Sequence, residues 1–511
     1  MRIIRGCHEV GAEAVAVYSD ADAGALHVRA ADAAVRLGSS PAVDSYLRIH
    51  RVVEAALATG CDAVHPGYGF LAERAAFARA VEAAGLAFVG PAPATIEALG
   101  DKLHARRLAV RVGVPSVPGT LEPALIDGPD RVAALLETAE GIGYPLLVKV
   151  AAGGGGRGMR RVQRAEDLAE ALASGAAEAA AAFGDGSVYL EREVRPARHV
   201  EVQLLGDAYG KVVALGERDC SLQRRHQKLV EEAPAPGLTE AQRLELHRLA
   251  VRLGIEAGLR NAATCEFLLD PNGGFWFLEV NTRLQVEHGV TELVTGIDIV
   301  REQLHIAAGR PLSAAVLAAA ECAASPSSVA IEVRIAAEDP AQAFAPTPGR
   351  IGRWVMPSGP GVRVDTAIES GDVVPPDYDN LVAKVMVHAH DRDAAIDRLR
   401  RALDETEIGG VQTTLSFHRA VAVSPAFRAG DLSTDWVAAN WDGEVAREAA
   451  ARRALLAAAL DAVGERRGAR MGGHMTANAA PAGKSPGGRP PAQRNAWRAA
   501  GRALGVDRWP T

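Results

Sequence analysis

Aromatic residues and long apolar runs are both scarce in this chain. Only 5% of its 511 residues are Phe, Trp or Tyr, although hydrophobic residues together make up 48%. A chain of this length holds roughly three domains of about 150 residues, and their cores must be built mainly from Ala, Val and Leu. No stretch reaches the roughly 18 uncharged apolar residues that a membrane-spanning helix needs. We therefore expect no membrane partner.

Cysteine is also rare and is scattered through the sequence. The five cysteines (Cys7, Cys61, Cys220, Cys265 and Cys322) are odd in number and show no paired spacing. This distribution argues against a disulfide framework and against a zinc site. The start of the chain lacks the apolar segment and the small-residue cleavage site of a signal peptide. Both features favour a cytoplasmic protein.

Basic residues are in excess only near the end of the sequence. The net charge is −7, but residues 443–511 contain 12 Lys/Arg and 5 Asp/Glu, a balance of +7, which leaves −14 on residues 1–442. The arginines of this tail are diluted among Ala, Gly and Pro and form no tight cluster. We interpret the tail as a helix (444–463) and a solvated low-complexity linker rather than a nucleic-acid-binding arm.

Residues 1–100 alternate short apolar runs with helical patterns. The runs "AVAVYS" (14–19), "CDAVHP" (61–66) and "LAFVGP" (86–91) end in turn residues. This alternation predicts an α/β domain with a doubly wound parallel sheet. Ligands bind such sheets at the carboxyl ends of the strands, where "HPGYGF" lies.

From residue 101 onward the predicted strands become longer. Between 101 and 305, segments such as "HVEVQLLG" and "GFWFLEVN" alternate apolar and polar residues, which predicts antiparallel strands with one covered face. A third set of strands, followed by a helix at 392–407, occupies residues 325–435. These two parts are therefore α+β in class.

The segment "TCEFLLDPNGGFWFLEVN" (264–281) predicts a hairpin. If its loop is 271–274, Asp270 faces Phe275 and Glu266 falls opposite Glu279. Like charges in such a position are destabilising, and a divalent cation between the carboxylates would offset the repulsion. Asn281 would share that face and add an oxygen ligand. The alternative is a slipped register with solvated carboxylates.

Polar residues recur at every second position beyond this hairpin. Glu279, Asn281, Arg283, Gln285 and Glu287 would all lie on one face of a continuing strand. That face combines acids, amides and a guanidinium, which can bind a small oxyanion and supply a base. An ordinary exposed strand face is the alternative interpretation.

A glycine-rich stretch, "LLVKVAAGGGGRGM" (146–159), raises the question of phosphate binding. It is not a P-loop, because no Gly-Lys-Ser/Thr follows the glycines. Lys149 and the bare backbone N–H groups together would suit a phosphate, whereas the lysine alone would be read as a surface side chain. Two other polar groups stand out: His199 with Glu201 on one strand face, and a basic turn around His226 and Lys228.

Taken in order, the motifs of this chain resemble one known family. "HPGYGFLAE", "VGPAPATIEALGDK", "GGGGRGM", "RHVEVQLLGD", "ERDCSLQRRHQKLVEEAPAP", "EVNTRLQVEH", "GIDIVREQL" and "VPPDYDNLVAKV" are similar to the biotin carboxylase component of acyl-CoA and pyruvate carboxylases. The resemblance covers about residues 10–435. It implies an amino-terminal doubly wound domain (1–100), an ATP-grasp domain (101–305), a carboxy-terminal biotin carboxylase domain (325–435) and a helix-plus-linker tail (443–511).

The resemblance also implies a role for individual residues. The implied ATP contacts are Lys102, Lys149, His199 and His226, with Gly155 and Gly156 in a lid and Glu191 to Val194 beside the adenine. The implied Mg²⁺ or Mn²⁺ ligands are Glu266, Glu279 and Asn281. The implied bicarbonate pocket comprises Arg283, Gln285, Val286 and Lys228, with Glu287 as the base and Arg334 stabilising the biotin enolate.

The implied reaction has two steps and needs partners. Bicarbonate attacks the γ-phosphorus of ATP to give carboxyphosphate and ADP; carboxyphosphate then yields CO₂, its phosphate takes the N1 proton of biotin, and N1 is carboxylated. No "MKM" biotinylation motif occurs in the sequence, so biotin is expected on a separate carrier protein or domain. A carboxyltransferase subunit of an acyl-CoA carboxylase and a second copy of this chain are the other expected partners.

One departure from the family pattern and two alternative functions remain open. The strand and glycine turn with which family members begin are not found here, so we expect either a misassigned start or an amino-terminal sheet without its first strand. Another ATP-grasp ligase, such as a carbamoyl-phosphate synthetase, shares the fold and the carboxyphosphate chemistry. A catalytically inactive assembly subunit is the alternative from another class.

Overall fold

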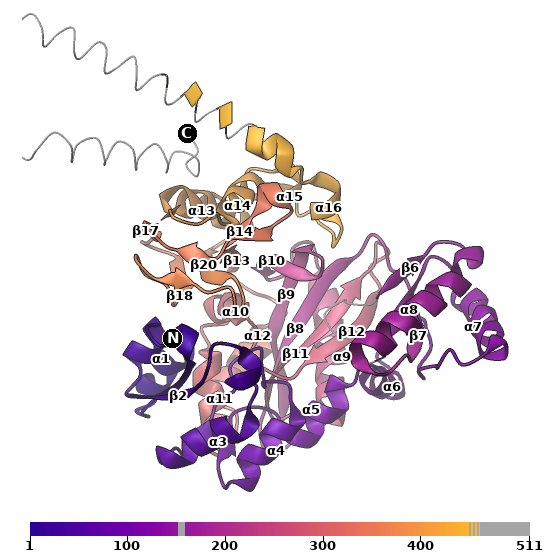
Figure 1. Cartoon of the computed structure of the whole chain (residues 1–511), viewed down its shortest axis with the longest axis horizontal. Coiled ribbons are helices and arrows are strands. Elements are labelled where there is room, and N and C mark those ends of the chain that lie inside the picture. Colours follow the sequence, from indigo (N-terminus) through magenta and orange to yellow (C-terminus); the bar gives the residue numbers. More distant parts are fainter. Residues whose placement is uncertain (152–158, 449–450, 453–454, 457–458, 460–511) are drawn as a thin grey trace, which may run out of the picture.

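The protein has three parts that follow one another along the chain (Figure 1). The structure is a computed structural model, and it describes residues 1–151, 159–448, 451–452, 455–456 and 459. No helix in these ranges is long and apolar enough to span a membrane. The expected helix at 444–463 falls within them only in part, where residues 443–448 are helical.

The first part alternates helices and short parallel strands, as predicted. Its elements are α1 (Arg2–Glu9), β1 (Val15–Ser19), α2 (Leu26–Ala30), β2 (Ala33–Gly38), α3 (Ile49–Ala58), β3 (Ala63–Val64), α4 (Ala75–Ala83), β4 (Ala87–Phe88) and α5 (Pro93–Gly100). Strand β1 pairs with β2 and β3 pairs with β4, both in parallel. Among the described residues these strands form two separate pairs rather than the single sheet that we expected.

The middle part is built on long antiparallel strands. Its elements are α6 (Lys102–Arg111), α7 (Pro129–Ile142), β5 (Leu146–Val150), β6 (Arg160–Val162), α8 (Leu168–Phe183), β7 (Val188–Arg192), β8 (Arg198–Gly206), β9 (Val212–Arg224), β10 (Gln227–Ala233), α9 (Glu240–Glu256), β11 (Asn261–Leu269), β12 (Phe275–Asn281), α10 (His288–Thr295), α11 (Ile299–Ala307) and α12 (Ala314–Cys322). Strands β5, β6 and β7 form a small sheet that α7 and α8 cover. This unit projects at the right of Figure 1.

The last part adds strands to the same large sheet. Its elements are β13 (Val329–Ala336), β14 (Glu338–Asp339), β15 (Ala345–Pro346), β16 (Gly349–Arg350), β17 (Trp354–Val355), β18 (Val362–Thr366), β19 (Val373–Val374), β20 (Leu381–Ala389), α13 (Arg392–Glu405), β21 (Glu407–Ile408), α14 (Leu415–Ala422), α15 (Pro425–Ala429) and α16 (Trp436–Asn440). The sheet runs in the order β12-β11-β8-β9-β10-β13-β20-β18. Pairing of β10 with β13 therefore joins the middle and last parts through backbone hydrogen bonds.

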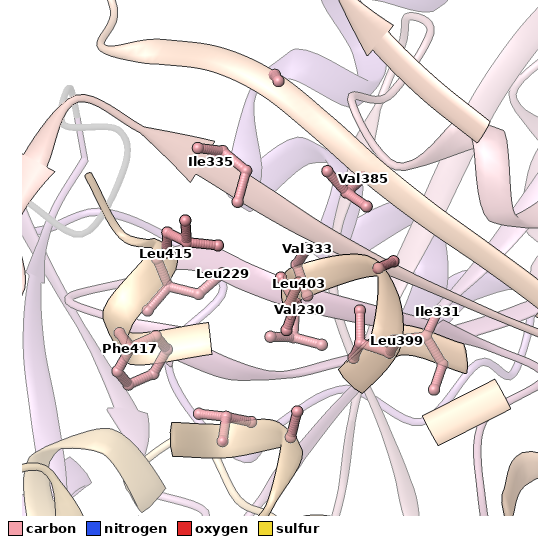
Figure 2. Packing of buried hydrophobic residues seen from close by; sticks show 14 of the residues in the cluster. Leu229, Val230, Ile331, Val333, Ile335, Val385, Leu399, Leu403, Leu415 and Phe417 are labelled. Atoms are coloured by element: carbon pink, nitrogen blue, oxygen red, sulfur yellow. The ribbon is translucent and has the colours of Figure 1, made fainter. Parts of the chain in front are cut away.

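The alternation of residues along β13 explains how this sheet separates a core from a polar face. Ile331, Val333 and Ile335 point into the largest apolar cluster, where they pack with Phe417 and residues of α13 (Figure 2). Each such buried aliphatic side chain contributes about 1.5–3 kcal/mol. Because successive side chains in a strand point to opposite faces, Glu332 and Arg334 lie on the other side.

Candidate functional site

Strands β11 and β12 place Glu266 opposite Glu279, as the sequence predicted, but by a different route. Leu269, not Asp270, pairs with Phe275, so the predicted loop was wrong by one residue. A β-bulge then leaves Leu278 without a partner and restores the register at the glutamates. Bulges of this kind re-aim side chains near functional sites.

The row of acids extends one strand further than we predicted. Glu266 is also the cross-strand partner of Glu201 on β8, and Glu201 in turn pairs with Arg218 on β9. Arg218 Nε donates to Glu201 Oε1 at 2.5 Å, and both side chains are fully buried. Three glutamates in neighbouring strands repel one another unless cations lie between them.

Lys228 supplies the central cation. Its Nζ lies 2.5 Å from Glu201 Oε2, 2.9 Å from Glu266 Oε1 and 2.7 Å from Glu287 Oε1. Burial disfavours the charged amine, but these three carboxylates outweigh burial and raise the pKa of Lys228 well above its usual value. Lys228 therefore stays charged and joins the metal-ligand candidate Glu266 to the proposed base Glu287.

The outer acids have cations of their own. His199 Nε2 lies 2.9 Å from Glu266 Oε2, and Lys102 Nζ lies 2.7 Å from Glu279 Oε2. Burial would raise the pKa of Glu266, but Lys228 and His199 hold it well below the usual range. Burial would lower the pKa of His199, and Glu266 reverses that effect and raises it. The repulsion that the sequence assigned to a metal is thus already offset by protein cations.

The chain leaves the sheet after Asn281, so the predicted strand face from 279 to 287 was wrong beyond that residue. Residues 282–287 form a loop that ends where α10 begins. Arg283 nevertheless reaches Asn281 Oδ1 at 3.2 Å and Gln285 Oε1 at 3.0 Å. Glu73, from the "HPGYGFLAE" motif of the first part, lies 3.0 Å from Arg283 Nε. Side chains rather than strand pairing hold this loop.

Glu287 is fully buried at the end of the loop, between two cations. Besides Lys228 it contacts Arg334, whose Nη2 lies 3.0 Å from Glu287 Oε2. Burial would raise the pKa of Glu287, but Lys228, Arg334 and Arg218 hold it well below its usual value. Glu287 is therefore ionised at neutral pH.

The lysines expected to bind phosphate pair with other acids, Lys102 with Glu279 and Lys149 with Glu191. Lys149 on β5 forms an ion pair with the buried carboxylate of Glu191 on β7, which also lies 3.0 Å from Arg106 Nη1. Val194 follows in the loop after β7 and is half-buried. Gly155 and Gly156 lie outside the described residues, so the expected lid is not described.

His226 lies at the tip of the hairpin that joins β9 and β10. Arg224 pairs with Gln227, and the two residues between them, Arg225 and His226, have φ of 48° and 66°. This left-handed backbone costs about 1–2 kcal/mol per non-glycine residue. Burial, followed by Lys149 and Lys102, lowers the pKa of His226, so its ring is neutral at neutral pH.

The oxygen atoms of Glu266, Glu279 and Asn281 suit a hard cation such as Mg²⁺ or Mn²⁺. At present Lys102 pairs with Glu279, while Asn281 donates Nδ2 to Glu266 Oε1 at 2.7 Å. Ligand atoms of His199, Glu201 and Glu266 also lie within 4.8 Å of one another, but Lys228 already bridges both of those carboxylates. Glu266 is common to both sets, but Glu279 and Asn281 are partly exposed, whereas Glu201 is fully buried and is also bonded to Arg218. The donor set that suits a divalent cation is therefore the one containing Glu279.

Comparisons with known proteins identify the family of this chain. Residues 1–96 match the model "Biotin carboxylase, N-terminal domain", residues 101–315 match "Carbamoyl-phosphate synthase L chain, ATP binding domain", and residues 332–439 match "Biotin carboxylase C-terminal domain". The chain is 46% identical to the biotin carboxylase of Pseudomonas aeruginosa, over 86% of this chain and 95% of that protein. The chain belongs to the biotin carboxylase family.

Two further relatives show how widely the family members differ in name. A pyruvate carboxylase subunit of Methanothermobacter thermautotrophicus is 44% identical over 86% of this chain and 87% of its own length. The biotin carboxylase domain dimer of Hydrogenobacter thermophilus 2-oxoglutarate carboxylase, solved with MgADP, ADP and bicarbonate, is 44% identical with a TM-score of 0.81, and covers 86% of this chain and 94% of that one. The biotin carboxylase models on either side of the ATP-binding domain favour this family over a carbamoyl-phosphate synthetase.

Several residues of this site have no role that could be predicted from the sequence. Glu201 stands out in "HVEVQ" because it alternates with His199, yet its contact with Lys228 depends on strands distant in sequence. Arg218 and Glu231, which is bonded to Arg334, carry no local signal. Lys384 does carry one, because it interrupts the apolar run "LVAKVMV" as Lys149 interrupts "LLVKV".

Proposed function

We propose that this biotin carboxylase uses ATP and bicarbonate to carboxylate biotin held on a separate carrier protein. The observation that carries the proposal is the position of Lys228, which contacts Glu266 on the nucleotide side and Glu287 on the bicarbonate side. A single buried cation between these two acids would hold the phosphoryl group that leaves ATP beside the bicarbonate that receives it.

The nucleotide side would bind the triphosphate with positive charge. Lys102, Lys149 and His199 are the phosphate contacts, and Gly155 and Gly156 belong to the same set by family resemblance. The segment from Glu191 to Val194 and the neutral ring of His226 would line the adenosine end. Glu266, Glu279 and Asn281 would hold Mg²⁺ or Mn²⁺, which when bound neutralises charge on the transferred phosphoryl group.

The loop after β12 would bind bicarbonate. Arg283, Gln285, Val286 and Lys228 surround the position, and a guanidinium is suited to a planar oxyanion. Glu287 accepts the bicarbonate proton, and the bicarbonate oxygen then forms a bond to the γ-phosphorus while the bond to the β-phosphate oxygen breaks. The products of this step are carboxyphosphate and ADP.

Biotin would be carboxylated on the side of Arg334. Carboxyphosphate breaks its O–C bond to give CO₂ and phosphate, the phosphate takes the N1 proton of biotin, and N1 bonds to the CO₂ carbon. The Arg334 guanidinium would stabilise the enolate oxygen that forms on the ureido ring. Glu287 and Lys228 are buried, and a closed pocket around them would keep water away from carboxyphosphate, which hydrolyses in open solution.

The partners follow from this chemistry and from the relatives. We propose that a biotin carrier protein brings biotin to the site and that a carboxyltransferase subunit removes the carboxyl group. Mycobacterium leprae has a relative named biotin-dependent acyl-coenzyme A carboxylase alpha3 subunit, 45% identical to this chain. A homodimer is also proposed, since the Hydrogenobacter domain is described as a dimer.

The test is bicarbonate-dependent ADP release by the purified chain, with and without free biotin. The proposal predicts that ADP release requires bicarbonate and increases with biotin. An inactive assembly subunit would bind ATP but show no biotin stimulation, which would contradict the proposal.

A further inference from the structure

Lys384, which has no assigned role so far, contacts the loop 283–287 from the last part of the chain. Glu73 holds Arg283 from the first part of the chain, and Lys228 and Arg334 hold Glu287. Between these anchors, the backbone carbonyl of Val286 accepts a hydrogen bond from Lys384 Nζ. Lys384 thus contacts the backbone of the proposed bicarbonate site from the last part of the chain.

The position of Lys384 is energetically unfavourable for a lysine, which suggests that the residue has a function there. On β20 it is the direct cross-strand partner of Arg334 on β13. Like charges in directly opposed positions destabilise a sheet, and burying a lysine adds a desolvation penalty. Both cations reach the same loop, because Arg334 contacts Glu287 while Lys384 contacts the preceding residue.

Acids on the neighbouring strands offset this pair of cations. Glu332 Oε2 lies 3.3 Å and Asp365 Oδ2 lies 3.8 Å from Lys384 Nζ. Burial would lower the pKa of Lys384, but Glu332 and Asp365 outweigh burial and raise it, so the amine stays charged. Arg334 has a separate partner, since its Nε donates to Glu231 Oε1 at 2.6 Å. Each cation is therefore held by its own acid and is aimed at its own loop atom.

We infer that Lys384 is a positioning residue that fixes the 283–287 loop for bicarbonate by holding the Val286 carbonyl. The inference rests on the proposed function, because it assumes that this loop binds bicarbonate. The phosphate lysines are held elsewhere: Lys102 pairs with Glu279 and Lys149 with Glu191. Loss of the Lys384 contact should consequently weaken bicarbonate binding and leave ATP binding nearly unchanged.

The experiment is Lys384→Met in the full chain, assayed by ADP release at varied bicarbonate and at varied ATP. A hydrogen bond from a charged donor is worth enough that its loss should raise KM for bicarbonate about 10- to 100-fold. KM for ATP should change by less than about threefold, and Lys384→Arg, which keeps a charged donor, should recover part of the loss. Lys211→Met, the same substitution at an exposed position, is the matched control.

The outcomes separate this inference from a purely structural role. Because Lys384→Met leaves Glu332 buried without its partner, the charge-balanced pair Lys384→Met/Glu332→Gln serves as the second variant if the first does not fold. The positioning role would be overturned if KM for bicarbonate and KM for ATP rose by the same factor while the thermal midpoint fell. An unchanged KM for bicarbonate would also overturn it. If the unmodified chain itself releases no ADP in response to bicarbonate, the proposed function fails, and this inference fails with it.

Discussion

Arg334 Nη2 lies 3.0 Å from Glu287 Oε2, although the two residues belong to regions that match different family models. The contact exists because β10 and β13 pair within one sheet and bring the last part of the chain beside the ATP-grasp part. Glu73 adds a residue from the first part. The site is therefore complete only when all three parts are folded together.

Replacing Glu287 with glutamine should separate proton transfer from binding. The amide keeps the shape of the side chain but cannot accept the bicarbonate proton, and a general base typically contributes about 10²–10⁴-fold to a rate. We expect kcat for biotin-dependent ADP release to fall at least about 100-fold, with ATP affinity nearly retained. Glu321→Gln, at an exposed position of α12, is the control. Near-normal turnover of Glu287→Gln would remove this residue from the role of base.

The variant Lys149→Met tests the nucleotide side. Glu191 would keep its ion pair with Arg106, so the buried acid is not left without a cation. We expect the Kd for ATP, measured by calorimetry, to rise about 10- to 100-fold because a charged hydrogen-bond donor to phosphate is lost. KM for bicarbonate should stay within a factor of two or three. If KM for bicarbonate rose while Kd for ATP stayed the same, Lys149 would belong to the bicarbonate pocket and not to the nucleotide side.

Metal dependence tests the assignment of Glu279. Chelation with EDTA should abolish ADP release, and added Mg²⁺ or Mn²⁺ should restore it. In Glu279→Gln the loss of a carboxylate ligand should raise the Mg²⁺ concentration needed for half-maximal activity about tenfold or more. If this variant requires no more Mg²⁺ than the unmodified chain, Glu279 is not a ligand.

The buried acids beside Arg334 predict a dependence of stability on pH. Burial, reinforced by Glu287 and opposed by Lys384 and Arg334, raises the pKa of Glu332 to about 7. The unfolded value is about 4.3, so between about pH 5 and 7 the folded chain holds a proton that the unfolded chain has released. This contribution to the free energy of unfolding is present at low pH and is lost as the pH rises through about 7.

Urea unfolding at pH 5.5 and pH 7.5 measures this effect. The variant Glu332→Gln cannot titrate, so its stability should decline less over this interval than that of the unmodified chain, by up to about 1.4 kcal/mol per pH unit. Parallel declines in the two proteins would show that Glu332 is ionised throughout and that its pKa is not raised.

Local pattern sufficed to predict the strands but not where they end. The alternation in "FWFLEVN" predicted β12 correctly. The same alternation continues through Arg283, Gln285 and Glu287, yet that stretch is a loop, because Glu73, Lys228 and Arg334 hold its side chains and α10 begins directly afterwards. Periodicity alone does not distinguish a strand from a loop whose polar residues have distant partners.

The charge network was the part least accessible from sequence. Predicting the row of Glu201, Glu266 and Glu279 requires knowing the order of the three strands that carry them. Predicting the central position of Lys228 also requires knowing where β10 lies in the sheet. The β-bulge at Leu278 compensated for an error in the predicted turn, so the facing glutamates were predicted correctly from an incorrect loop. Only the family resemblance brought Arg334 into the predicted site.

Transfer of ¹⁴C from bicarbonate to biotin by the purified chain, with ATP and Mg²⁺ present, tests the central claim most directly. The account predicts acid-labile carboxybiotin in proportion to ADP released, and its loss in Glu287→Gln. ADP released in response to bicarbonate with no label on biotin, or label that forms equally well in Glu287→Gln, would contradict it.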